Sequence, residues 1–189
     1  ELKPQFSNNI EVSHTYKNVL TTTLNYTFTN VILQSVLEQK GQVAYMTRAN
    51  LASLRQYGIA VSLNTSWTKW WTNNLYVNVY HNSFKGVVNN VPVGFSAPRL
   101  TLNGSQQFKL NKSLTAELNG FYRTGGVDGV IRTKAMGALS AGFSQQVLKN
   151  KGSIRLTVRD IFYTQRANAT TKYGNVDVAF QEVGDSRVV

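Results

Sequence analysis

The chain has 189 residues, enough for one domain of ordinary size with a sizeable core. Hydrophobic residues make up 42% of it, yet no apolar run approaches the roughly 20 residues that a transmembrane helix needs, so a helical membrane protein is excluded. The chain has 20 Lys and Arg against 9 Asp and Glu, which gives a net charge of +11. Because these cations are dispersed along the chain, we expect them to lie beside a membrane rather than to form a nucleic-acid interface.

The first predicted strands alternate apolar and polar residues with the period of two that marks a β-strand between two different environments. In residues 9–17, Ile10 and Val12 alternate with Glu11 and Ser13. Residues 19–37 continue the pattern with hydroxyl and amide side chains on one face. Tight-turn signals at 17–18 and a closing turn at 40–42 predict that these strands form hairpins.

The stretch 43–67 keeps one parity for about twenty-five residues, roughly four to five times the length of a usual strand. One face is apolar or aromatic and the other is small or polar, apart from a polar interruption at Ser53 and Arg55. A strand of this length suits a barrel wall that crosses a membrane and continues beyond it. At Ser53 and Arg55 the alternatives are a bulge or a break, and a tight turn near Arg55 would reverse the orientation of everything before it.

All three tryptophans, Trp67, Trp70 and Trp71, lie within five positions beside a short turn at 72–74. Trp is amphipathic and settles at the boundary between membrane and water, so the cluster predicts part of an aromatic girdle. The alternative is three core tryptophans of a soluble sheet. Their clustering beside a turn favours the girdle.

Further strands are predicted over 75–84, 95–109, 114–123, 135–147, 153–163 and 175–182, which gives about nine in all. Short turns at 17–18, 72–74, 110–112 and 149–152 alternate with longer loops at 38–42, 85–94, 124–134 and 165–173. This alternation is typical of an up-and-down transmembrane β-barrel, with short periplasmic turns and longer outer loops. We therefore predict an all-β, antiparallel barrel segment.

Two groups of candidate site residues follow from this arrangement. The charged residues that share the parity of the small and hydroxyl side chains are expected to face the lumen: Glu11, Arg48, Glu117, Arg123, Arg155 and Arg159. They either pin neighbouring strands through opposite charges or line a substrate path, and both interpretations stay open. The candidate outer-loop contacts are Asn89, Asn90, Asp128 and Arg132.

Signals for catalysis are weak. His14 and His81 are the only histidines, and the chain has no cysteine, so a zinc site lacks ligands. His81 and Asn82 are adjacent on a strand and point to opposite faces, so they cannot cooperate simply. The glycine-rich stretch 125–129 lacks the strand–helix context and the Lys-Ser/Thr pair of a phosphate-binding loop. We expect no enzyme, no metal and no cofactor.

Three stretches resemble the C-terminal barrel segment of TonB-dependent outer-membrane receptors of the Bacteroidetes type, a branch of the outer membrane β-barrel family. Residues 2–9 are close to the pattern L-x-P-E-x-S-x-N, with Gln5 in place of Glu. Residues 45–58 are similar to the family's Y-x-N … G strand, and 155–163 to L-x-V-x-D-I-F-N, with Tyr163 where Asn is usual. The plug domain, the TonB box and the closing aromatic residue of the family are not seen.

The resemblance implies that residues 1–189 are one β-barrel segment without a plug domain, a fragment of a barrel of about twenty-two strands. The parent would reside in the bacterial outer membrane and import a bulky nutrient, such as a siderophore, glycan or peptide. Its implied partners are outer-membrane lipid and lipopolysaccharide, the TonB system and a surface lipoprotein. No nucleic-acid partner is expected, and we expect the open sheet edges to pair with another chain.

Two rival interpretations remain at this point. A small independent outer-membrane barrel would act as a pore or an adhesin. A soluble β-rich protein with a basic surface would act as a binding protein. Folding without detergent would favour the soluble protein over both membrane interpretations.

Overall fold

The computed structural model describes residues 3–41, 43–50, 53–88, 90–149 and 151–182. These residues form fourteen strands, all in antiparallel pairs. The strands are β1 (Phe6–Tyr16), β2 (Leu20–Asn30), β3 (Leu33–Lys40), β4 (Val43–Asn50), β5 (Ser53–Ser66), β6 (Trp71–Val88), β7 (Val91–Lys109), β8 (Leu114–Arg123), β9 (Gly126–Asp128), β10 (Ile131–Thr133), β11 (Met136–Val147), β12 (Gly152–Val158), β13 (Ala167–Tyr173) and β14 (Val176–Glu182). Over the described ranges we find no helix of the length and apolarity that crossing a membrane requires. The all-β, antiparallel prediction is confirmed.

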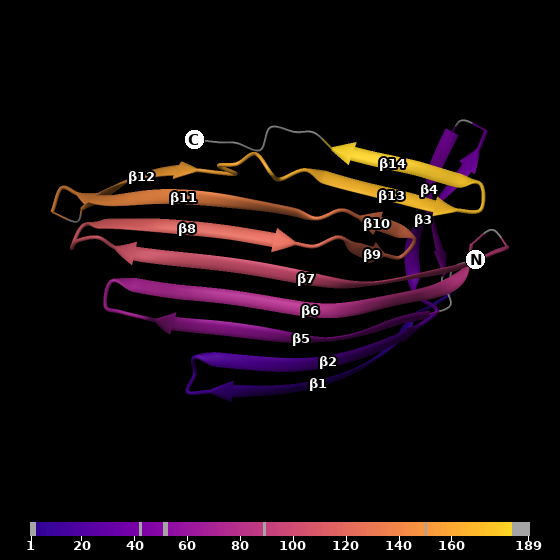
Figure 1. Cartoon of the computed structure of the whole chain (residues 1–189), viewed down its shortest axis with the longest axis horizontal. Coiled ribbons are helices and arrows are strands. Elements are labelled where there is room, and N and C mark those ends of the chain that lie inside the picture. The colour runs from indigo at the N-terminus through magenta and orange to yellow at the C-terminus, as the bar shows by residue number, and fades with distance from the viewer. Residues whose placement is uncertain (1–2, 42, 51–52, 89, 150, 183–189) are drawn as a thin grey trace.

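Eight strands form the main sheet in the order β1-β2-β5-β6-β7-β8-β11-β12, and two smaller sheets hold β14-β13-β10-β9 and β3-β4 (Figure 1). Each strand of the main sheet lies beside the one that precedes it in the chain, apart from the inserted hairpins. The connections β1–β2, β5–β6, β7–β8 and β11–β12 lie together at one end, on the left of Figure 1, which we call the turn end. The inserted hairpins lie at the other end, which we call the hairpin end.

Local side-chain chemistry fixes the tight connections at the turn end. Lys17 and Asn18 have φ of 50° and 53°, the left-handed pair that a type I′ hairpin turn requires. Thr68 Oγ1 accepts the backbone N–H of Trp71 at 3.0 Å, and Asn111 Oδ1 accepts that of Leu114 at 2.9 Å. These Asx- and Ser/Thr-type turns satisfy backbone groups that no strand partner reaches.

The prediction of one strand over 43–67 is wrong. β4 pairs only with β3, whereas β5 pairs with β2 and β6; Leu51 and Ala52, between them, lie outside the described residues. There is no tight turn near Arg55, which lies within β5 opposite Phe28. The β3–β4 hairpin instead leaves the hairpin end of the paired β2 and β5, so the predicted direction of the chain is retained.

All four predicted loops contain paired strand residues, and these predictions are wrong. In the loop predicted at 38–42, residues 38–40 belong to β3 and pair with 43–45 of β4. The short turn predicted at 72–74 is also wrong, because these residues lie in β6 and pair with β5. The stretch 85–94 belongs to β6 and β7, which pair from Trp71↔Phe108 as far as Val88↔Val91. The stretch 124–134 contains the β9–β10 hairpin, and 165–173 contains β13. Conversely, the strand predicted over 153–163 ends at Val158, because Asp160 takes a φ of 46° and starts a turn. Cross-strand pairing, rather than local composition, orders these segments.

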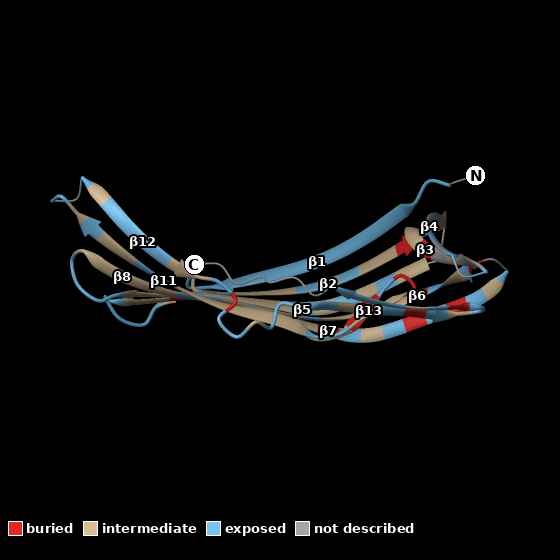
Figure 2. Cartoon of the chain, turned by 90° about the horizontal axis from the view of Figure 1, so that it is seen from above, coloured by how far each residue is buried: buried red, intermediate tan, exposed pale blue. Residues whose placement is uncertain are grey.

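The main sheet is curved like a trough, and β3 and β4 lie above its concave side near one end (Figure 2). The largest buried apolar cluster lies at this hairpin end and joins the main sheet to the inserted hairpins. It contains Ile32, Val36, Phe84, Val88, Val93, Phe95, Val127 and Val130. Within the described residues, β1 and β12 each pair on one side only, so the sheet has two open edges.

Candidate functional site

The register of the main sheet separates its side chains into two faces of opposite character. Directly opposed residues share a face, as Leu24, Ile59 and Val79 do on neighbouring strands. The concave face, which the buried cluster marks, carries mostly small and polar residues, among them Ser13, Thr21, Thr23, Asn25, Ser62, Asn78, Thr101, Asn103, Ser105, Asn119 and Ser144. The sheet therefore separates a polar interior side from an apolar exterior side.

The convex face carries a continuous band of exposed and half-buried apolar side chains. Its members are Ile10, Val12, Leu24, Ile59, Val61, Val77, Val79, Leu100, Leu102, Leu118, Leu139, Ile154 and Leu156. Leu24 is 54% exposed and Ile154 65%, too much for the interior of a soluble protein. A contiguous apolar surface of this extent marks contact with lipid or with another protein.

Aromatic residues bound this band at both ends. At the turn end, Trp71 lies opposite Phe108, and toward the hairpin end Tyr57 stacks on His81 with ring centroids 5.3 Å apart. About ten residues of β6 separate the two levels, which is about 34 Å along a strand and about 26 Å after a tilt of roughly 40°. The hydrocarbon-facing band of an outer-membrane barrel is about 25 Å tall, so the dimensions agree.

The polar interruption at Ser53 and Arg55 lies beyond this band. Ser53 pairs with Lys85 and Arg55 with Ser83, on the hairpin side of the Tyr57–His81 level. The convex face thus becomes polar where the strand would leave the hydrocarbon. The polar pair Ser53 and Arg55 therefore marks the boundary of the apolar band. It does not break a strand, because both residues lie within β5.

The three predicted girdle tryptophans form one aromatic cluster at the turn end. Trp71 lies 6.1 Å from Trp67, 6.2 Å from Trp70 and 5.9 Å from Phe108, all between ring centroids. Its indole N–H donates to Gln106 Oε1 at 2.7 Å. Trp67 and Trp70 are more than half exposed. Phe108 was missed from the sequence, although its parity and its place just before the turn at 110–112 pointed to it.

Comparison with known families agrees with this geometry. The sequence profile of the outer membrane protein beta-barrel family matches residues 1–189. The chain belongs to that family. As a member of the outer membrane protein beta-barrel family it resides in the bacterial outer membrane. No curated protein matches the chain, and neither does any solved structure.

Four of the predicted lumen residues in this family member lie on the concave face of the main sheet. Glu11 pairs with Asn25, and Glu117 pairs with Gly142, while Arg123 pairs with Met136. Arg155 Nη2 lies 2.6 Å from Glu117 Oε2 across β11, an ion pair in which the arginine side chain is 59% exposed. Such an exposed pair fixes strand alignment more than it adds stability.

The other two predicted lumen residues lie outside the strands of the main sheet. Arg48 belongs to β4 and thus to the separate two-stranded sheet. Arg159 follows the end of β12 and is exposed, and it lines a cavity with Asn103, Asn119 and Ser140 of the concave face, as the lumen prediction expects. Asp160 accepts the backbone N–H groups of Thr164 and Gln165 at 2.9 and 3.0 Å, so its carboxylate organises the turn after β12.

The predicted outer-loop residues do not form one site. Asn89 lies outside the described residues, and Asn90 lies at the tip between β6 and β7 with a φ of 64°. Asp128 accepts a hydrogen bond from Gln34 Nε2 at 3.2 Å, which joins β9 to β3. Arg132 lies with its guanidinium carbon 5.5 Å from the Phe95 ring centroid. Asp128 thus joins two inserted hairpins to each other, and Arg132 holds its hairpin against the main sheet.

The β13–β14 hairpin is held in part by a surface ion pair. Lys172 Nζ donates to Asp177 Oδ2 at 2.8 Å. This hydrogen bond to Asp177, together with the negative charge of that carboxylate, raises the pKa of Lys172. Both side chains are more than two-thirds exposed, so the pair aligns the hairpin rather than forming a binding site.

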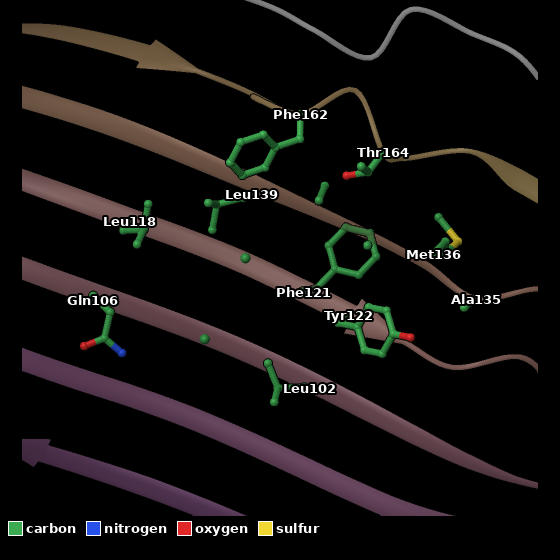
Figure 3. Close-up of a pocket in the computed structure, with 14 residues that line it drawn as sticks. Leu102, Gln106, Leu118, Phe121, Tyr122, Ala135, Met136, Leu139, Phe162 and Thr164 are labelled. Carbon is green, nitrogen blue, oxygen red and sulfur yellow. The ribbon is translucent and has the colours of Figure 1, made fainter.

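An apolar groove of about 540 Å³ crosses β7, β8 and β11 on the main sheet (Figure 3). On the convex face it arises where Gly104 pairs with Gly120, since neither strand fills the space there. Leu102, Leu118, Leu139 and Phe162 surround it. Because these leucines belong to the apolar band, the groove faces the side that contacts lipid.

Arg99 is a buried basic residue that the sequence pattern missed. It lies on β7 opposite Tyr80, on the concave face, and is only 9% exposed. Its parity is that of Thr101 and Asn103, but the pattern was weak between Pro92 and Pro98. The predicted strand over 95–109 contains it, and applying the parity of Thr101 and Asn103 at position 99 would have added it to the lumen-facing residues.

Proposed function

We propose that the chain forms part of the barrel wall of a TonB-dependent outer-membrane receptor that imports a bulky nutrient, such as a siderophore, glycan or peptide. The concave face would line the import path, and the convex face would contact the lipid. TonB would carry the energy for import from the inner membrane to the full-length receptor, of which this chain would be a part. A surface lipoprotein would deliver the nutrient to the hairpin end.

The observation that carries this proposal is the space enclosed by the sheet. A closed barrel of eight strands has an interior just wide enough to be filled by side chains. Here the concave side of an eight-stranded sheet also holds inserted hairpins, packed through Val36, Val127 and Val130. Together with the two open edges among the described residues, this supports a wider barrel to which other strands contribute.

The motifs of residues 2–9, 45–58 and 155–163 give independent support, because they resemble this receptor type in order and spacing. In the last of them, Asp160 ends β12 and caps the turn that follows it. This role in the turn would explain why the motif of such barrels has an aspartate at this position.

The proposal is tested with the full-length gene product in its native bacterium. We expect the deletion strain to lose growth on one nutrient of more than porin size, and a plasmid copy to restore it. The same loss is expected when TonB is deleted. Uptake that persists without TonB would refute the receptor and favour the rival small pore; outer-membrane location without any uptake defect would favour an adhesin.

A further inference from the structure

A buried arginine, with no counter-ion among the residues that the structure describes, lies on the concave face near the hairpin end. Arg99 Nη2 donates to Thr133 Oγ1 at 2.6 Å, and its Nε is buried without a hydrogen-bond partner. Its side chain passes beneath Gly126, where a Cβ would lie 2.5 Å from Nε. The chain therefore leaves room for this guanidinium and gives it one neutral acceptor.

A second arginine repeats this pattern close by. Arg123 lies on the concave face of β8 opposite Thr101, which is two residues from Arg99 on β7. Diagonal neighbours of this kind lie about 7–8 Å apart. Arg123 Nη2 donates to the thioether sulfur of Met136 at 2.9 Å, a weak acceptor, and its Nε is also buried without a partner.

Neither guanidinium pairs with a carboxylate in the described part of the chain. Arg155, on the same face, shows the contrasting case, because Glu117 lies 2.6 Å from it. A buried charge is costly unless it is paired and hydrogen-bonded. Arg99, which is buried, and Arg123, which is half-buried, therefore have only neutral acceptors and no carboxylate among the described residues to balance their charge.

A cavity of about 540 Å³ lies beside these two arginines at the hairpin end. Arg123, Thr133 and Lys134 line one side, and β13 and β14 line the other. Arg99 reaches the cavity wall through its hydrogen bond to Thr133. Glu182 is the one carboxylate in the described lining, so the cations around the cavity outnumber it.

We propose that this cavity binds an oxyanion group, a carboxylate or a phosphate, of the solute that the barrel imports. Guanidinium groups bind these oxyanions through paired, charge-assisted hydrogen bonds. Arg123 lines the cavity and supplies such donors, whereas Arg99 lies behind the cavity wall, hydrogen-bonded to Thr133, and adds positive charge there. Lys134 adds a third positive charge. That the anion belongs to an imported solute rests on the proposed function; the anion site itself does not.

Lipopolysaccharide phosphates are not the source of this anion. Arg99 and Arg123 lie on the concave face, and the apolar band that contacts lipid lies on the convex face. The anion must therefore arrive through the interior of the barrel. Free phosphate and small carboxylates share the necessary chemistry and serve as probes.

The test measures binding of inorganic phosphate and of succinate to the full-length protein in detergent, by isothermal titration at low and at physiological salt. We expect Arg123→Gln to weaken binding at least tenfold, Arg123→Lys to weaken it less, and Arg99→Gln, which removes a charge from behind the cavity wall, to weaken it by a smaller factor than Arg123→Gln. The matched control is Arg155→Gln, which removes the same charge from the same face and should leave binding within twofold. Glucose should not bind to this site.

Two results would overturn the proposal: no binding of either anion to the wild-type protein, or equal weakening by Arg123→Gln and Arg155→Gln. Heat-modifiable migration on a gel checks that each variant is folded, and Arg123→Lys remains informative if Arg99→Gln misfolds. Failure of import with intact anion binding would refute only the proposed function. Import that is unchanged in the Arg123→Gln protein would refute only the assignment of the anion to the solute.

Discussion

Replacing Val77 by Arg tests which face of the sheet contacts lipid. Val77 lies on β6 between the Trp71 and His81 levels, close to the middle of the apolar band, and pairs with Val61 and Leu102. An arginine on the lipid face of a barrel costs about 2–4 kcal/mol at the bilayer midplane and about 0–1 kcal/mol near the interface. We therefore expect Val77→Arg to lower the folding equilibrium constant by roughly 30- to 900-fold.

The assay is reversible folding of the full-length protein into phosphatidylcholine vesicles, followed by guanidinium titration. Thr23→Arg is the matched control, since Thr23 lies at nearly the same depth on the concave face. Its direct neighbours Ser13 and Ala60 are small, so a long side chain fits there. The control loses a hydrogen bond of 3.1 Å between two exposed hydroxyls and should cost less than about 1 kcal/mol.

Equal destabilisation by Val77→Arg and Thr23→Arg would refute the assignment of the two faces. Greater destabilisation by Thr23→Arg would reverse it. The assignment would gain further support if Val77→Arg lowered the stability of the protein in lipid and left it unchanged in a folded, detergent-free state. That result would show that the cost arises from the hydrocarbon and not from the sheet.

Gly58→Ala should destabilise the barrel by about 1–3 kcal/mol, because the new Cβ would lie 2.5 Å from the Val79 carbonyl oxygen; Gly94→Ala, with no atom within 4 Å, should be neutral in the same titration. Asp160→Ala should cost about 1–3 kcal/mol by removing both acceptors of the turn after β12, and Asp160→Asn, which tolerates the same φ and keeps one acceptor oxygen, should cost less. Equal losses of stability in Asp160→Ala and Asp160→Asn would assign the effect to the backbone conformation at this position instead of to the side-chain acceptors. Trp71→Ala should cost about 1–3 kcal/mol and Trp67→Ala less, since Trp71 contacts three rings and Gln106 while Trp67 is 58% exposed; the reverse order in thermal unfolding would count against the girdle.

Much of the wall was predictable because alternation is a local property. The parity of Ile10, Leu24 and Val79 identifies the apolar face without knowledge of the register. The tryptophan cluster was found for the same reason, since Trp67, Trp70 and Trp71 are close in sequence. The ion pair between Glu117 and Arg155 was not predicted as a pair, although both residues were placed on the polar face, because β11 separates their strands.

The hairpin end was predicted poorly because its order depends on distant residues. Gly86 and Pro92 indicated a loop, yet β6 and β7 continue there as Phe84, Val88, Val93 and Phe95 pack against the inserted hairpins. The break after Asn50 has the same origin: β4 leaves the main sheet, and its partner β3 enters the buried cluster through Val36. No local signal in 43–67 reports that change of partner.

The alternation of side chains was enough to predict an antiparallel sheet with one apolar and one polar face and with short turns at one end, because a period of two assigns each residue to a face. The return of the hairpins over the concave face, and the pairing of the charges there, depend on tertiary packing. Arg99 and Arg155 occupy similar alternating positions, yet one is buried against Thr133 and the other pairs with Glu117. Burial and partnership depend on segments far apart in the chain, and alternation carries no information about them.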